Sequence, residues 1–125
     1  MTNESVHKEI KVILNILKSF NNIIPNELIP NIFENLKTKY STPEYRCPLL
    51  YITSWRTIYE IEGQFYEFAF CYGILQSETT TIKFIKIKKK KDVIEEINSL
   101  INYYQDLNNE QAIEDLKKVE QSIKF

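Results

Sequence analysis

Apolar residues at helical spacing dominate the first third of the chain. Between residues 4 and 20 they recur every three or four positions, which predicts an amphipathic helix that ends at Asn21-Asn22. The stripe consists of Val6, Ile10, Ile13, Leu14 and Leu17, extended by Ile16 and Phe20. A second stripe, with Leu28, Ile29, Ile32, Phe33 and Leu36, predicts a helix over 26–39, with Pro30 either at its start or in its first turn. We expect the two helices to form an N-terminal hairpin.

The apolar period changes to two after a loop at 40–48, which is marked by Pro43 and Pro48. A strand is predicted from Leu49 to residue 61, with a bulge near Trp55-Arg56 because a continuous strand of this length is uncommon. A tight turn at Gly63 leads to a second strand over 64–75, and a turn at 76–78 leads to a third over 79–89. These segments predict a three-stranded antiparallel meander.

Helical spacing returns after the third strand. Asp92 is in a suitable position to cap a helix whose stripe includes Val93, Ile97 and Ile101. A break at 106–109 precedes a last helix, whose apolar face is formed by Ala112, Leu116, Val119 and Ile123. The expected fold is therefore α+β in the order α-α-β-β-β-α-α, with residues 1–125 forming one domain.

Composition narrows the class of protein. With 43% hydrophobic and 26% charged residues, the chain has the composition of a globular protein and not of a disordered segment. It has no apolar run long enough for a membrane span, and its N-terminus does not resemble a secretory signal. We therefore expect a cytoplasmic protein, a monomer or homodimer, whose two cysteines, Cys47 and Cys71, remain reduced.

Residues that carry catalytic or metal chemistry are sparse. His7 is the single histidine, and Cys47 lies in a loop without a recognisable base beside it. No cluster has the spacing of metal ligands, and no glycine-rich nucleotide-binding motif occurs. The sequence therefore predicts neither a catalytic site nor a metal or cofactor, and a non-enzymatic protein is expected.

A lysine-rich segment runs from the third predicted strand into the following helix. It contains Lys83, Lys86, Lys88, Lys89, Lys90 and Lys91. Cations beside an aromatic residue such as Phe84 are typical of nucleic-acid binding. Lysine is also common at strand ends, where it prevents edge-to-edge pairing of sheets. The net charge of −1 favours this second interpretation, with an acidic partner as a further alternative.

Aromatic and acidic residues gather around the first predicted β-hairpin. The candidate partner-binding residues are Trp55, Tyr59, Glu60, Glu62, Tyr66 and Glu67. Tyr and Trp are enriched in interface hot spots, although the same rings also suit a core covered by helices. If they are exposed, they form an aromatic and acidic surface that complements a basic partner such as a toxin or enzyme.

Three functional hypotheses follow. The leading one is a small non-catalytic protein-binding module of the inhibitor or immunity-protein kind, which masks a partner protein. The alternative is a nucleic-acid-binding protein that uses the lysine-rich strand 83–91. The third is a small-ligand-binding protein or enzyme with a pocket that no local motif reveals.

Overall fold

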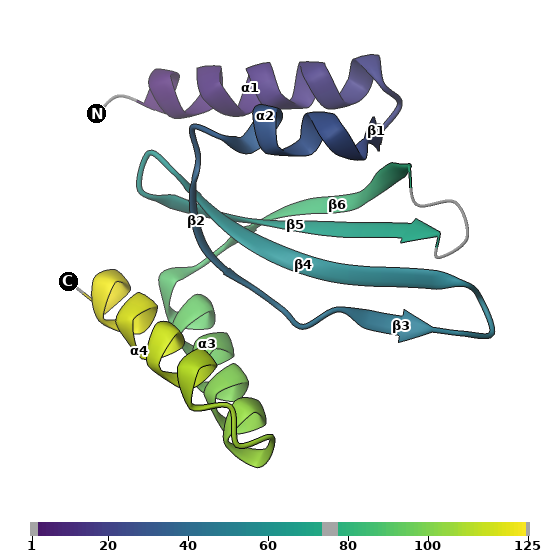
Figure 1. The fold of residues 1–125 in the computed structure, drawn as a ribbon. Coiled ribbons are helices and arrows are strands. Elements are labelled where there is room, and N and C mark those ends of the chain that lie inside the picture. The colour runs from purple at the N-terminus through teal and green to yellow at the C-terminus, as the bar shows by residue number, and fades with distance from the viewer. Residues whose placement is uncertain (1–2, 74–77, 125) are drawn as a thin grey trace. The chain divides into compact units, whose positions relative to one another are not determined.

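The chain folds into two compact units, Met1–Ile87 and Lys88–Phe125. A computed structural model describes residues 3–73 and 78–124 (Figure 1). The elements of the first unit are α1 (Asn3–Ser19), β1 (Ile23–Pro25), η1 (Asn26–Leu28), α2 (Ile29–Phe33), β2 (Lys37–Ser41), β3 (Tyr45–Cys47), β4 (Ile52–Ile61), β5 (Gln64–Gly73) and β6 (Thr79–Lys88). The second unit contains α3 (Lys90–Asp106) and α4 (Glu110–Lys124).

The sheet is antiparallel and has six strands, where the sequence predicted three. Its order is β1-β6-β5-β4-β2, and β3 also pairs with β4 (Figure 1). The predicted meander of β4, β5 and β6 forms its centre and is confirmed. The three additional strands are short and lie along its edges, where β1 pairs with β6 while β2 and β3 share the outer side of β4.

The predicted N-terminal helical hairpin is wrong in its second half. The helix expected over 26–39 is reduced to η1 and the five residues of α2, with Pro30 in its first turn. Lys37–Ser41 forms β2 because it pairs with β4, where Lys37 lies opposite Glu60. The backbone hydrogen bonds of an available strand edge outweigh the helical pattern of the preceding residues. The segment 40–48 is likewise not a plain loop, because it contains β3.

Two turns form where the sequence predicts them. At the end of α1, Asn21 and Asn22 adopt left-handed conformations with φ of 54° and 61°, which reverse the chain as predicted. Between β4 and β5, Glu62 and Gly63 have φ of 53° and 82° and form a two-residue hairpin turn. The bulge expected at Trp55-Arg56 is absent, since β4 and β5 pair without a register shift from Ile52 to Ile61. The turn predicted at 76–78 falls largely outside the described residues.

The hydrophobic core of the first unit lies between one face of the sheet and the helices α1 and α2 (Figure 1). Alternation along β4 and β5 places Tyr59, Tyr66 and Phe68 on this face. The ring of Phe33 from α2 stacks on Tyr59 with a centroid distance of 4.8 Å and meets Phe68 edge-on at 5.1 Å. Helix α1 contributes Ile10, Ile13 and Leu17 of its predicted stripe to the same cluster, whereas Leu14 of that stripe and its extension Phe20 remain exposed.

The second unit is a helical hairpin. The predicted break is confirmed at 107–109, where Asn108 has a φ of 55° and Asn109 Oδ1 accepts a hydrogen bond of 3.1 Å from the Ala112 amide. Helix α3 begins at Lys90, so Asp92 lies in its first turn and is not the N-cap residue that the sequence predicts. Its carboxylate still suits the positive end of the helix dipole. Within the described ranges, no helix has the length and apolarity needed to cross a membrane.

Candidate functional site

The six residues predicted to bind a partner do not share one surface. Strand alternation places Trp55, Tyr59 and Tyr66 on the sheet face that α1 and α2 cover. Tyr59 and Tyr66 are buried there, and the half-buried Trp55 stacks on Phe70 at a centroid distance of 5.4 Å. These aromatic residues therefore contribute to the core, which was the alternative interpretation of their pattern.

Two acidic residues of the predicted surface, Glu60 and Glu67, lie on the opposite face and already have cationic neighbours. Glu60 Oε2 is 3.5 Å from Lys39 Nζ and 3.9 Å from Lys37 Nζ. The Lys39 side chain is almost completely buried, and desolvation lowers its pKa, against which the charge of Glu60 acts. Glu62 is half-buried in the turn between β4 and β5.

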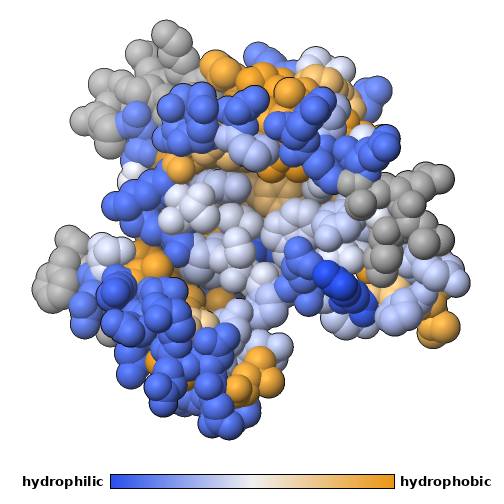
Figure 2. All heavy atoms as spheres, in the orientation of Figure 1, coloured by the Kyte–Doolittle hydropathy of each residue, from blue (hydrophilic) through white to orange (hydrophobic). Residues whose placement is uncertain are grey.

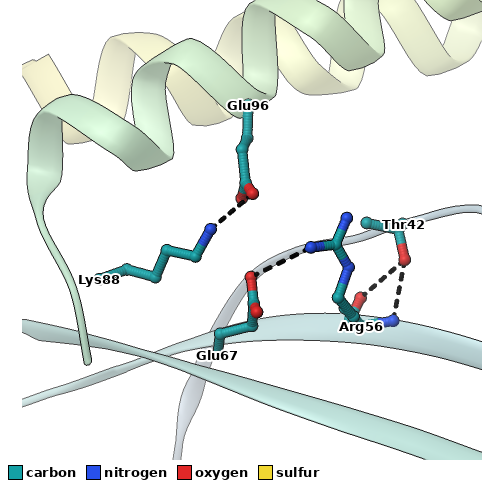
Figure 3. A network of polar contacts seen from close by, with 5 residues as sticks. All are labelled: Thr42, Arg56, Glu67, Lys88 and Glu96. Carbon is teal, nitrogen blue, oxygen red and sulfur yellow. Dashed lines mark hydrogen bonds and ion pairs between the residues drawn. The ribbon is translucent and has the colours of Figure 1, made fainter. Parts of the chain in front are cut away.

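Glu67 is buried, and its carboxylate is paired with an arginine. Arg56 Nη1 lies 3.6 Å from Glu67 Oε2, as Figure 3 shows. The backbone of Arg56 is held by Thr42, whose Oγ1 accepts a 2.8 Å hydrogen bond from the Arg56 amide. Arg56 is thus fixed at both its backbone and its guanidinium group, while 47% of its side chain remains exposed.

The lysine-rich segment is divided between the two units. Lys83 and Lys86 are exposed on β6 in the first unit, and Lys89, Lys90 and Lys91 are exposed around the start of α3 in the second. Lys88 is mostly buried and donates a hydrogen bond to Glu96 of α3 (Figure 3). One of the six predicted cations is therefore engaged within the second unit.

The sequence interpretation missed an exposed apolar turn at the end of the β3–β4 hairpin. Leu49, Leu50 and Tyr51 expose 90%, 65% and 57% of their surface. Figure 2 shows an apolar patch at this turn, separate from the larger one over α1 and α2. We call residues 48–51 the hairpin tip. Three consecutive exposed apolar residues are unusual on a protein surface that has no partner.

The hairpin tip has a defined backbone geometry. The Leu50 amide donates to the Cys47 carbonyl at 3.1 Å, which closes a turn with Pro48 at its second position. Tyr51 then adopts a left-handed conformation with a φ of 52°. For a residue with a bulky side chain this conformation costs about 1–2 kcal/mol. The strand pairing of Cys47 with Ile52 fixes the turn and keeps the leucines in solvent.

A groove lies next to this hairpin, and its lining includes Ser54, Arg56 and Ala69, which strand alternation places on the sheet face opposite α1 and α2. It has a volume of about 380 Å³, and its lining residues all belong to the first unit. They are Thr42, Pro43, Tyr45, Ser54, Trp55, Arg56, Ala69, Phe70, Lys83 and Phe84. Ser54 and Ala69 have small side chains on this face, and longer ones surround them, so the sheet surface is hollowed there.

The groove carries two cations between aromatic side chains. Arg56 and Lys83 supply the charges, while Tyr45 and Phe84 expose 65% and 44% of their surface. Among the described residues, no carboxylate lies within ion-pair distance of Lys83. This arrangement can bind an anionic group beside an apolar or planar one.

The two cysteines and the histidine are the candidates for reactive chemistry. Cys47 and Cys71 are both free and half-buried. His7 lies in α1, and its side chain is outside the described part of the structure. In residues 3–73 and 78–124, no three metal-ligating side chains lie together. Comparisons with models of known protein families, with curated protein sequences and with solved structures found no match.

Proposed function

We propose that this protein is a small non-catalytic protein-binding module that contacts its partner with the β3–β4 hairpin. The observation that carries the proposal is the exposure of Leu49 and Leu50 at a turn with a fixed backbone. Leucine side chains gain about 1.5–3 kcal/mol each when they are fully buried. Burial of both leucines by a partner is therefore favourable, and little ordering of the turn is required.

The strained backbone of the hairpin tip supports the same proposal. Tyr51 holds a left-handed conformation that glycine or asparagine would adopt at lower cost. Sparsely populated backbone conformations are often retained at functional sites, where they present particular side chains. Here the conformation directs a tyrosine into solvent beside two leucines, and Tyr is among the residues that contribute most to interface hot spots.

The predicted acidic surface takes a smaller part in this proposal. Glu60 and Glu67 each lie within 4 Å of a cation of the same chain, so their charges are partly neutralised. Of the predicted residues, Glu62 remains a candidate contact on the β4–β5 turn. An inhibitor of the immunity-protein kind would then block its target by covering it with the hairpin, with electrostatics in a secondary role.

Quantitative affinity capture from native cell extract tests the proposal. The double variant Leu49→Ser/Leu50→Ser should lose the proteins that the wild-type chain captures specifically. The matched control is Val12→Ser/Leu14→Ser, which removes two apolar side chains from α1 that are 52% and 43% exposed. Equal loss with both variants, or retention of every captured protein by the hairpin variant, would contradict the proposal.

The alternative of nucleic-acid binding is favoured by one observation, the position of Lys83 next to Phe84 in the groove. Single-stranded nucleic acids bind to aromatic side chains flanked by cations, with strong salt dependence. A labelled oligothymidine strand should then bind at low salt and bind more weakly to Lys83→Gln. An unchanged mobility at low salt would eliminate this alternative.

A further inference from the structure

The groove and the hairpin tip share one structural element, although they have different chemistry. Strand β3 provides Tyr45 to the groove and leads directly into the tip at Pro48. The tip is apolar and uncharged, whereas the groove contains Arg56 and Lys83. A partner that covers the tip and extends along β3 therefore meets a cationic site.

We propose that the groove binds the acidic side chains of a partner peptide in extended conformation, while an apolar residue of that peptide packs between Tyr45 and Phe84. This inference rests on the proposed protein-binding function and specifies the chemistry of the partner. Charge complementarity identifies the occupant, since Lys83 has no carboxylate neighbour among the described residues.

Arg56 is suited to recognise a carboxylate even though it contacts Glu67. A guanidinium group has five N–H donors in a rigid fork, and 47% of the Arg56 side chain is exposed, so a ligand in the groove can reach it. Glu67 and Thr42 hold the arginine in place, so little side-chain entropy is lost when a ligand binds. Glu67 is thereby a positioning residue for Arg56.

The small side chains at the floor of the groove leave the space that the ligand occupies. Ser54 and Ala69 lie on neighbouring strands and on the same face as Arg56, which is opposite Ala69 in the ladder. Larger side chains at these positions would fill the hollow. Ser54→Phe therefore removes the binding space without changing either cation.

The neighbouring surface and the charge of the chain both favour a peptide over a nucleic acid as the ligand of the groove. The exposed leucines adjoin the groove through β3 and are suited to contact apolar side chains, not phosphates. The chain has a net charge of −1, and the groove has two cations, fewer than a backbone-tracking nucleic-acid surface normally carries.

Fluorescence anisotropy with defined probes tests this inference. The probes are a labelled synthetic peptide of alternating Asp and Tyr, the matched Asn and Tyr peptide, and a labelled oligothymidine strand. The Asp peptide should bind at least about tenfold more tightly than the Asn peptide, a difference of about 1.4 kcal/mol. Lys83→Gln should weaken its binding about threefold, and Ser54→Phe should abolish it. Lys11→Gln, an exposed change on α1, is the control and should have no effect.

Two sets of results would overturn the inference. One is equal binding of the Asp and Asn peptides. The other is tighter binding of oligothymidine, with competition for the same site, which would assign the groove to nucleic acid. If Ser54→Phe does not fold by circular dichroism, Lys83→Glu replaces it, since this exposed change should reverse the preference for the Asp peptide. Loss of captured proteins with the hairpin variant, together with no Asp-peptide binding, would refute this inference and leave the proposed function intact.

Discussion

Lys39 Nζ lies 3.5 Å from Glu60 Oε2, although only 3% of the lysine side chain is exposed. Lys39 is the extra residue of a β-bulge, where the register of β2 against β4 shifts between Thr38 and Tyr40. An inward-pointing charge and a bulge both hinder another chain from adding to an edge strand. The pair thus protects the outer part of the sheet at an energetic cost that Glu60 reduces.

We expect Glu60→Gln to lower the free energy of unfolding by about 1–2 kcal/mol, because it leaves the buried ammonium group without its counter-charge. Lys39→Met should cost less, since it removes the desolvated charge together with its need for a partner. Urea denaturation of both single variants and of the double variant measures the coupling between the residues. Additive effects in this cycle would show that the two side chains do not stabilise each other.

The lowered pKa of Lys39 has a defined effect on stability. Between its pKa in the folded protein and the ordinary value of 10.5, the unfolded chain binds more protons than the folded chain. The free energy of unfolding therefore rises with pH across that interval. Below it, the cost of burying the charged Lys39 ammonium group is fully present. Lys39→Met should flatten the rise in urea midpoint between neutral and mildly alkaline pH. An unchanged slope would contradict the assigned cause.

Tyr59 makes stability depend on pH in the opposite direction, and it does so at higher pH. Burial raises its pKa to about 12, above the ordinary value of 10, because the charged phenolate is disfavoured beside Phe33 and Phe68. The folded protein keeps the proton that the unfolded chain loses, so stability falls as the pH rises from 10 to about 12. Tyr59→Phe should move alkaline unfolding, followed by circular dichroism, to higher pH. Identical alkaline midpoints for both proteins would refute this.

In the turn between β4 and β5, one substitution should stabilise the protein and a neighbouring one should destabilise it. Glu62 has a φ of 53°, which asparagine tolerates better, so Glu62→Asn should stabilise the protein by about 0.5–1 kcal/mol. Gly63 has a φ of 82° and open space around it, so Gly63→Ala should destabilise by about 1 kcal/mol through backbone strain alone. Thermal unfolding measures both changes. Stabilisation by Gly63→Ala would be inconsistent with this turn geometry.

Much of the fold could be predicted where the sequence has a long and regular period. Helix α1, the meander of β4, β5 and β6, and the final helix each bury a continuous stripe, and their boundaries agree within a few residues. The edge strands could not be predicted in this way. β1 and β3 have three residues each, and β2 follows a helical stripe, so their pairing partners determine their structure.

The candidate site was less predictable than the fold. Leu49 and Leu50 look like the start of the strand that follows, because no glycine or asparagine marks their turn, and only Pro48 indicates it. The groove depends on the juxtaposition of the β3–β4 hairpin with β5 and β6, and β3 and β6 lie far apart in the sequence. The predicted aromatic and acidic patch failed to form one surface because alternation separates its members between two faces.

Site-specific photo-crosslinking is the most direct test of the protein-binding function. A photoreactive residue is placed at position 49, and a second protein carries it at position 12, which is exposed on α1. We predict one defined covalent adduct with another protein from position 49 in native extract, absent from position 12 and diminished by Leu50→Ser. Adducts of equal yield and diversity from both positions, or crosslinks to nucleic acid alone, would contradict a partner-binding hairpin.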